Sequence, residues 1–103
     1  MSETEVTITR HGDPARGEYV AAVAGSEATG RLTWQAAPGF DDGAVRIADH
    51  TLVPTEIGGR GVAARLVEAM IADARAEGFR IVPACSYVAV AFRRHPEWAD
   101  LRV

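Results

Sequence analysis

The stretch Pro54–Ala63, with the sequence PTEIGGRGVA, joins an apolar run to a strongly periodic segment. Its glycines permit backbone conformations that other residues avoid, and they let the chain pass close to a ligand. The free N–H groups in the first turn of a helix attract anions, and the helix dipole adds a favourable potential. The stretch therefore predicts either a backbone cradle for a phosphate or pyrophosphate, or a tight turn without a ligand.

The segments on both sides of this stretch predict a βαβ unit. Ala44–Val53 is long enough for a central strand, and Pro54 ends it because proline cannot donate a hydrogen bond to a neighbouring strand. In Val62–Glu77 apolar residues recur at spacings of three and four, which predicts an amphipathic helix closed by Gly78. Phe79–Pro83 then predicts a short strand that returns beside the first through a right-handed crossover.

The rest of the chain completes an α/β (α+β) fold. Val6–Arg10 alternates apolar and polar residues, as a half-buried strand does, and Tyr19–Val23 and Ala28–Ala36 predict two more strands. Tyr87–Arg94 has helical spacing, with Ser86 as its N-cap. We therefore expect a mixed sheet with an antiparallel N-terminal meander and a C-terminal βαβα unit.

Length, composition and charge predict one domain over residues 1–103. Apolar residues make up 48% of the chain and charged residues 24%, values that are usual for a soluble globular protein. The net charge is −3 without any run of Lys or Arg, which argues against a nucleic-acid partner. No apolar stretch approaches the roughly 20 residues that span a bilayer, and the start of the chain is acidic where a secretory signal is basic. We expect a cytoplasmic location and no membrane partner.

The chain has one cysteine and three histidines. The single Cys85 permits no internal disulfide, which agrees with a reducing compartment and leaves a free thiol. The histidines show none of the close His/Cys spacings of zinc sites, so no metal site is expected.

Two nucleotide-binding motifs are excluded for the glycine stretch. It lacks the Gly-Lys-Ser/Thr ending of a nucleoside-triphosphate P-loop, and it lacks a Gly-x-Gly-x-x-Gly with an acidic partner about 20 residues on. Gly58–Ala63 instead resembles the GNAT N-acetyltransferase signature, Arg/Gln-x-x-Gly-x-Gly/Ala, which binds the pyrophosphate of coenzyme A between the fourth strand and the following helix. The match holds from the fourth position onward. Gly58 stands where that family usually has Arg or Gln, and Arg60 would compensate.

The chain is similar in particular to the short GNAT-like subfamily, which lacks the long N-terminal helices of larger members. The similarity is best over Ile47–Leu101, and it rests on the segments His50–Pro54, Gly59–Ala63, Val82–Val88 and Arg93–Trp98. It implies that acetyl-CoA is the acetyl donor, with its arm between the fourth and fifth strands, and that an amine is the acceptor. The implied coenzyme-binding residues are Leu52, Val53, Gly58, Gly59, Arg60, Gly61, Val62, Ala63, Arg93 and Arg94.

Neither the acceptor amine nor the oligomeric state follows from the sequence. A fold without the usual N-terminal helices has little surface from which to shape an acceptor pocket. A non-catalytic acyl-CoA-binding or regulatory module is therefore the alternative to an enzyme. A protein-interaction domain with a vestigial loop is a third interpretation.

Acyl transfer needs a bound thioester, a deprotonated amine and a proton for the leaving thiolate. His50 lies near the end of the predicted fourth strand, and histidine titrates in the range that suits a general base; a strand histidine bonded to backbone is the other interpretation. Cys85 precedes a predicted helix, whose N-terminus would favour the thiolate; a small buried hydrophobe is the alternative. The short subfamily associates both residues with its active site. An acetyl-cysteine intermediate therefore competes with direct attack by the amine.

Tyr87, Arg93 and Arg94 complete the set of candidates. Tyr87 would protonate a leaving thiolate, although an aromatic residue at a helix start more often packs in the core. Arg93 and Arg94 would meet the 3′-phosphate of coenzyme A, but a charged pair near a helix end is also ordinary dipole complementarity.

Overall fold

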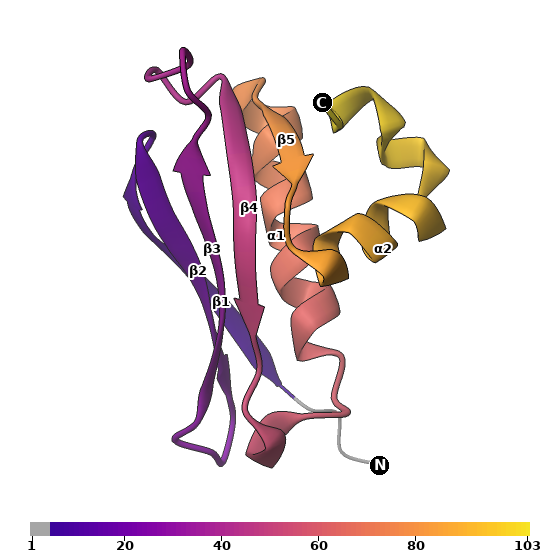
Figure 1. Cartoon of the computed structure of the whole chain (residues 1–103). Coiled ribbons are helices and arrows are strands. Elements are labelled where there is room, and N and C mark those ends of the chain that lie inside the picture. The colour runs from indigo at the N-terminus through magenta and orange to yellow at the C-terminus, as the bar shows by residue number, and fades with distance from the viewer. Residues whose placement is uncertain (1–4) are drawn as a thin grey trace.

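Five strands form one sheet in residues 5–103, the part of the chain that the computed structural model describes. Their bounds are β1 Val6–Asp13, β2 Arg16–Val23, β3 Thr29–Ala36, β4 Val45–Leu52 and β5 Arg80–Pro83. They lie in chain order, with β1 to β4 antiparallel and β5 parallel to β4 (Figure 1). The predicted mixed sheet is confirmed. The acidic start of the chain, residues 1–4, lies outside the described part.

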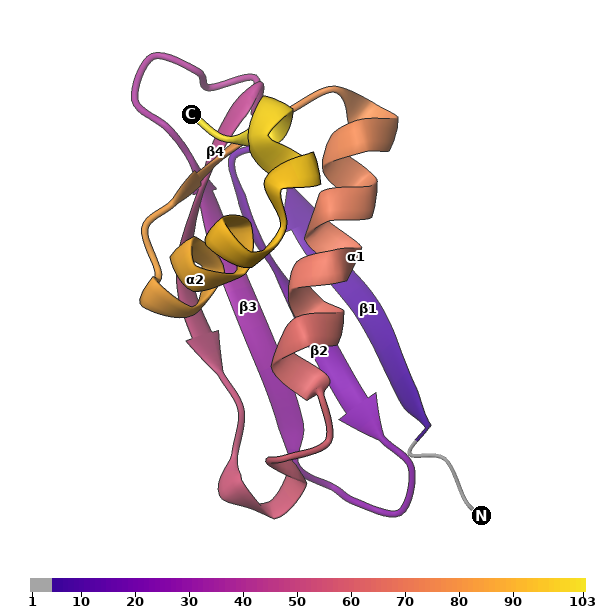
Figure 2. The ribbon, with the colours of Figure 1, turned by 90° about the vertical axis from the view of Figure 1, so that its right-hand side faces the viewer.

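Two α-helices and two 3₁₀ turns accompany the sheet in the same residues. Their bounds are η1 Thr55–Ile57, α1 Val62–Glu77, α2 Ser86–Arg94 and η2 Pro96–Leu101. Helix α1 packs across β1, β2 and β3, while α2 and η2 lie beside it on the β5 side (Figure 2). The opposite face of the sheet carries no helix in residues 5–103, and we call it the open face.

Helix α1 ends as the sequence predicts, whereas helix α2 begins one residue earlier than predicted. Helix α1 has the predicted bounds, and Gly78 ends it in the left-handed region, with φ 82°, where its N–H bonds to Ala74. The prediction of Ser86 as the N-cap of α2 is wrong, because Cys85 holds that position and Ser86 is already helical. The N–H groups of Ala84 and Cys85 both donate to the carbonyl of Ala48, so the chain turns into the helix one residue early.

Strands β1 and β2 are longer than the sequence predicted, because a tight turn joins them. The carboxylate of Asp13 accepts the N–H groups of Ala15, at 2.8 Å, and of Arg16, at 3.2 Å. This side-chain turn fixes the register in which Asp13 faces Arg16 and Val6 faces Val23.

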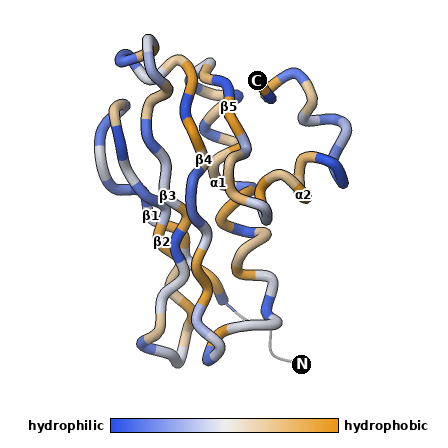
Figure 3. The backbone as a smooth tube through the Cα atoms, viewed as in Figure 1, coloured by the Kyte–Doolittle hydropathy of each residue, from blue (hydrophilic) through white to orange (hydrophobic). Residues whose placement is uncertain are grey.

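The core lies between the sheet and the apolar face of α1 (Figure 3). The buried residues of α1 are Val62, Leu66, Val67, Met70, Ile71 and Ala74. Gly30 of β3 lets the start of this helix approach closely, since a Cβ there would lie 3.0 Å from a methyl of Val62 and 3.4 Å from one of Leu66. The N-terminus of α1 is thereby held next to the end of β4.

Polar contacts tie the second half of α1 to β1 and β2. The hydroxyl of Tyr19 donates to Asp73 at 2.8 Å, and Arg10 bridges Asp73, at 3.0 Å, and Glu77. Burial, and then the bond to Asp73, raise the pKa of the Tyr19 phenol far above its usual range. The hydrogen bond to Glu77 raises the pKa of Arg10, so this helix–sheet pair stays charged at physiological pH.

Arg46 fixes the first half of β4 against the same end of α1. The guanidinium carbon lies 3.9 Å from the ring centre of Phe79, and Nε donates to the carbonyl of Gly43 at 3.0 Å. Burial lowers the pKa of Arg46, while the carboxylate of Glu77, at 3.7 Å, opposes that effect. The paired part of β4 is therefore anchored by a desolvated cation.

The ring of Trp34 on β3 lies over Gly17 on β2. These residues are cross-strand partners, and a Cβ at Gly17 would come within 2.4 Å of two ring carbons. We expect Gly17→Ala to reduce the free energy of unfolding by about 1–3 kcal/mol, because the ring is 2% exposed and has little room to move. Urea denaturation measures the change.

Gly58→Ala is the matched control for this substitution. Gly58 has φ −69°, and a Cβ there would meet its nearest neighbour, the carbonyl of Thr55, at an ordinary 3.4 Å. The free energy of unfolding should change by less than about 0.5 kcal/mol. Equal losses in the two variants would contradict the packing argument.

Candidate active site

A gap opens beside β4 where β5 ends. The two strands pair in parallel from Val45 with Arg80 to Ala48 with Pro83, and β4 then continues to Leu52 without β5 beside it (Figure 1). The N–H groups of Ala84 and Cys85 bond to the carbonyl of Ala48 at 3.1 and 2.9 Å, so the chain turns away from β4 at that point. We call the space between residues 49–52 of β4 and the start of α2 the gap.

The glycine loop, residues 58–61, lies between η1 and the start of α1. Gly59 and Gly61 have φ values of 74° and 72°, in the left-handed region that favours glycine, and a Cβ at either would meet nothing within 4 Å. Gly61 is the N-cap of α1, and no side chain caps this end of the helix. The N–H groups of the first turn of α1 are thus available to an anion that approaches the loop.

Gly58, Arg60 and Ala63, which are also predicted to bind the coenzyme, differ from one another in backbone conformation and exposure. Gly58 has ordinary extended backbone, so the conformation does not require glycine where the family usually has Arg or Gln. The side chain of Arg60 is exposed and makes no ion pair in residues 5–103. Ala63 is half-buried in the first turn of α1. The loop therefore offers backbone donors and one free cation.

Cys85 faces the gap at the N-terminus of α2. Its thiol is half-buried and donates to the hydroxyl of Thr51 on β4, at a distance of 3.3 Å. Burial raises the pKa of the thiol, but the hydrogen bond that it shares with the Thr51 hydroxyl and its contacts with the backbone of Val88 and Tyr87 outweigh burial and lower the pKa below its ordinary value. These contacts therefore stabilise the thiolate more than the surroundings of an ordinary cysteine do.

His50 lies on the other side of β4 from Cys85. It pairs with Thr33 on β3, whereas Thr51 pairs with Leu32, which is buried under α1. Partners in a cross-strand pair share a face, so the imidazole lies on the open face while Thr51 and Cys85 lie on the helix face. The structure therefore brings Cys85 together with Thr51, and it does not bring Cys85 together with His50.

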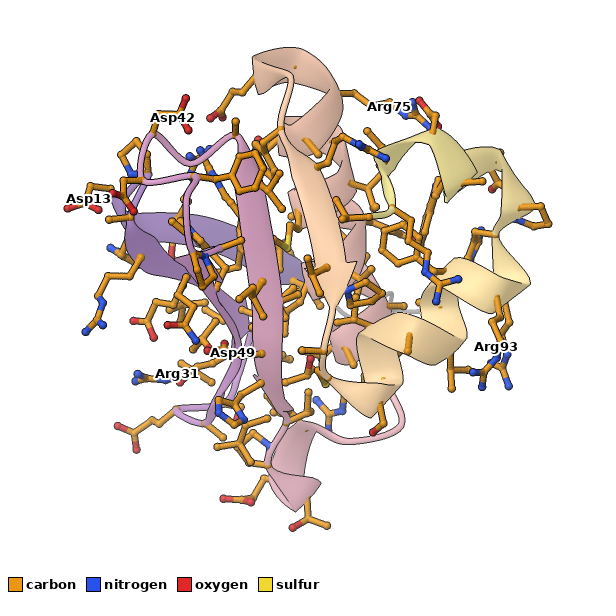
Figure 4. The ribbon with its side chains drawn as sticks, turned by 45° about the horizontal axis from the view of Figure 1, so that its top comes forward. Asp13, Arg31, Asp42, Asp49, Arg75 and Arg93 are labelled. Atoms are coloured by element: carbon orange, nitrogen blue, oxygen red, sulfur yellow. The ribbon has the colours of Figure 1, made fainter. Side chains whose placement is uncertain are left out.

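A narrow groove lies between α1 and α2. It holds about 130 Å³ and is lined by Ala64 and Glu68 of α1 and by Tyr87 and Arg94 of α2, among others. Tyr87 is 41% exposed, so it is not a core aromatic. Arg93, on the same last turn of α2, extends away from the molecule (Figure 4). Only one of the two predicted arginines thus faces the groove.

The end of β4 supplies the remaining predicted coenzyme-binding residues. Leu52 is a large apolar side chain that is 64% exposed, and Val53 is partly buried against the core. Both follow the last pairing of β4 with β5 and precede η1. Leu52 pairs with Arg31, so its side chain lies on the open face with His50, whereas Val53 packs against the core.

Two residues at this site were absent from the sequence interpretation. Thr51 is the partner of the Cys85 thiol, and strand alternation in β4 was the signal that could have placed it on the helix face. Asp49 is the extra residue at a register shift between β3 and β4, and nothing in the sequence marks a bulge there.

Comparison with known proteins identifies the family. A sequence model of the family described as GCN5-related N-acetyl-transferase matches residues 18–101. The chain belongs to this family. The match includes β3 to α2, with the glycine loop, His50 and Cys85, and it confirms the GNAT resemblance predicted from the sequence.

A solved structure shares the fold of this GNAT family member. It is a solution NMR structure from Staphylococcus aureus, described as a "GCN5-like putative N-acetyltransferase", with 24% sequence identity and a TM-score of 0.65. The similarity covers 100% of this chain and 91% of that one. Comparison with curated protein sequences found no match.

None of the helices in residues 5–103 combines the length and the hydropathy needed to cross a membrane. In the same residues, no three His, Cys, Asp or Glu side chains come together as a metal site.

Thr51→Val tests the pKa of the Cys85 thiol. The substitution removes the hydroxyl that stabilises the thiolate and leaves the shape of the side chain nearly unchanged, so the pKa should rise. We expect the midpoint of the pH dependence of alkylation by iodoacetamide to lie higher in the variant, with slower alkylation at neutral pH. Thr9→Val, on the exposed side of β1, is the control and should leave the midpoint in place. Identical midpoints in all three proteins would contradict the assignment.

Proposed function

We propose that this protein is an N-acetyltransferase that takes the acetyl group from acetyl-CoA and transfers it to an amine. The observation that carries the proposal is the arrangement of two helix N-termini, at Gly61 and at Cys85, around the gap beside β4. The first, at Gly61, suits a pyrophosphate; the second, at Cys85, suits a thiolate next to a thioester.

The glycine loop fits the pyrophosphate of coenzyme A. The left-handed glycines at 59 and 61 leave open space where side chains would otherwise stand. In residues 5–103, the N–H groups of the first turn of α1, including those of Val62 and Ala63, have no capping side chain. Arg60 adds a cation that has no ion-pair partner in residues 5–103. Together they offer the backbone donors and positive potential that a diphosphate needs.

The gap fits the pantetheine arm. A linear amide chain that starts at the glycine loop would follow the backbone of β4 past Thr51 and reach the thiol of Cys85 at the far end of the gap. Backbone groups of β4 beyond Ala48 are no longer paired with β5, so they are available to the amides of the arm. The thioester would then lie beside Cys85.

Cys85 is the proposed nucleophile. Its thiolate attacks the thioester carbonyl, a new C–S bond forms, and the bond to coenzyme A breaks with release of that thiolate. Tyr87, two residues along and exposed beside the groove, is the proposed donor of a proton to the leaving sulfur. The acetyl group then passes from Cys85 to the amine.

Calorimetric titration with acetyl-CoA tests the proposal directly, and Gly61→Ala sharpens it. A side chain at φ 72° strains the loop by about 1–2 kcal/mol, so the affinity for acetyl-CoA should fall about tenfold. Gly39→Ala is the matched control, because Gly39 also has a left-handed φ, 86°, and open space, but lies in the β3–β4 loop at the other end of the molecule. It should lose stability without losing affinity. A folded protein that does not bind acetyl-CoA at millimolar concentration contradicts the proposal, and binding without turnover supports the acyl-CoA-binding module instead.

Arg94 and Arg93 form a matched pair for the 3′-phosphate of coenzyme A. Arg94 lines the groove between α1 and α2, while Arg93 points away from it. We expect coenzyme A to bind more tightly than dephospho-coenzyme A. Arg94→Ala should reduce the ratio of the two affinities about fivefold, which is the effect expected from the loss of an exposed ion pair. Arg93→Ala should preserve the preference. Equal effects in calorimetric titrations of the two variants would show that neither arginine is specific.

A further inference from the structure

Strand β1 is a free edge of the sheet. In residues 5–103 no other strand borders its outer side, because the strand order runs from β1 to β5 and only β2 lies next to β1 (Figure 2). The opposite edge differs, since Arg102 forms a bridge with Ile81 of β5 and the N–H of Val103 donates to the carbonyl of Ile81 at 2.9 Å. The described part of the chain thus covers β5 and leaves all eight residues of β1 open on one side.

The hydrogen bonds to β2 show which backbone groups of β1 are free. The N–H of Ala24 donates to the carbonyl of Glu5, and the register of β1 and β2 sets these two residues opposite each other. Hydrogen-bonded pairs alternate along an antiparallel ladder, so the odd-numbered residues of β1 bond to β2 and the even-numbered ones direct their N–H and C=O groups outward. The outward groups belong to Val6, Ile8, Arg10 and Gly12.

The first part of β1 lacks the features that keep an edge strand from pairing. Residues 6–10 contain no proline and no lysine, they are rich in β-branched side chains, and their register with β2 has no bulge. The one charge among them, Arg10, turns toward α1, where it bridges Asp73 and Glu77. The outer side of this segment is therefore regular backbone without a protecting charge.

The residues of this edge are complementary to themselves about Ile8. When two copies pair antiparallel at that centre, every outward N–H and C=O group of the even-numbered residues from 6 to 10 meets a partner. The side chains match as well, because no charge faces a like charge and β-branched residues face each other at the centre. The opposed pairs are Ile8 with Ile8, Thr7 with Thr9, Val6 with Arg10 and Glu5 with His11.

Other registers fit this edge less well. A shift by one residue sets the outward groups opposite groups that already bond to β2. A centre at Thr9 instead of Ile8 draws Gly12 into the ladder, and its φ of 117° departs from regular strand geometry. A centre at Arg10 sets two like charges against each other. A centre at Thr7 pairs fewer of the outward groups, since Arg10 then extends past the start of β1.

A hollow of about 420 Å³ lies where β1 meets α1. Ile8 and Tyr19 line it from the sheet, and Ala69 and Ala72 line it from the helix. Because alanine has no side chain beyond Cβ, α1 leaves room above the edge for side chains of a second copy. Ile8 is only partly buried against the core, so a second Ile8 beside it would remove more apolar surface from water.

We propose that two copies of this chain pair through their β1 strands, antiparallel and centred on Ile8, so that their sheets join into one. The two-fold axis is perpendicular to the joined sheet, so both α1 helices lie on the same face. The gap beside β4 is separated from this seam by β2 and β3, so the pairing leaves it open in both copies and does not depend on the proposed function. The contact is one strand and one hollow from each copy, which makes the dimer weak and reversible.

The first experiment measures the mass of the whole chain in solution by sedimentation velocity. Over a range from about 20 μM to about 1 mM, we expect a monomer–dimer equilibrium with a Kd of about 100 μM, as befits a small interface. A strand of a different protein is the other possible occupant of a free edge. A chain that stays monomeric over the whole range overturns the proposal and leaves the edge to such a partner.

The second experiment tests the register with two charge variants, Thr7→Lys/Thr9→Lys and Thr7→Glu/Thr9→Glu. Both threonines are exposed, and they face the uncharged residues Ala22 and Val20 on β2, so the chain should tolerate the charges. In the proposed dimer like charges would oppose each other, so each variant alone should dimerise at least about tenfold more weakly than the parent protein. A mixture of the two should dimerise again, because each lysine then faces a glutamate.

The control for the lysine variant is Ala22→Lys/Gln35→Lys. It makes the same change of net charge at two exposed strand positions that are not on the edge, so its dimerisation should match that of the parent protein. Equal weakening in the control and in the edge variants would show a general effect of charge and overturn the assignment. Dimers that both edge variants still form, or variants whose mixture stays monomeric, would overturn the register.

The third experiment compares amide hydrogen exchange at two protein concentrations by NMR. Between about 50 μM and about 1 mM, the amides of Val6, Ile8 and Arg10 should exchange about threefold more slowly, in proportion to the fall in the monomer fraction at the expected Kd. The amides of Thr7 and Thr9 bond to β2 in monomer and dimer alike, so their exchange should not change. Concentration-dependent protection confined to other segments, or equal protection of odd and even residues, would place the contact elsewhere and overturn the proposal.

Discussion

The carbonyl oxygen of Ala48 accepts two N–H groups, from Ala84 and Cys85, and the candidate active site depends on this contact. It marks the last point at which β4 holds its parallel neighbour, since β5 ends at Pro83 and proline cannot donate to a further pairing. From there the chain turns directly into α2, with Cys85 as the N-cap. The gap beside β4, the position of the thiol and the direction of α2 are therefore consequences of one pair of hydrogen bonds.

The sheet divides the chemistry into two environments. On the helix face, Cys85 and Thr51 lie between α2 and β4, where burial and hydrogen bonds act on the thiol in opposite directions. On the open face, Asp49 lines a broad hollow over β1 to β4, and His50 lies on the same face opposite Thr33. Because successive residues of a strand point to opposite faces, His50 and Thr51 are neighbours in the chain and yet belong to different surfaces. One short strand segment thus contributes side chains to both surfaces.

The sequence predicted those elements whose physical signal is local. The spacing of apolar residues gave α1 its bounds, and the glycine at 78 closes it as expected, because both depend on residues within a few positions. The bulge at Asp49 depends on how β3 pairs with β4, and the early start of α2 depends on the distant carbonyl of Ala48, so neither could be read from neighbouring residues. For the same reason the sequence indicated His50 and Cys85 as candidates but not that they lie on opposite faces. It also missed Thr51, whose role is defined only by its contact with the thiol.

In the proposed function, the two helix N-termini around the gap allow a short fold to bind a long anionic ligand with few charged side chains. At α1 the left-handed glycines expose the N–H groups of the first turn, and at α2 the N–H groups of Tyr87 and Val88 contribute to lowering the pKa of Cys85. Each terminus carries about half a positive charge that costs no side-chain ordering when an anion binds. In the proposed function, one terminus stabilises the fixed charge of the pyrophosphate and the other stabilises the charge that develops on sulfur. In the proposed function, the first-turn N–H groups of α1 and the cation of Arg60 together replace the Arg or Gln that is missing at Gly58.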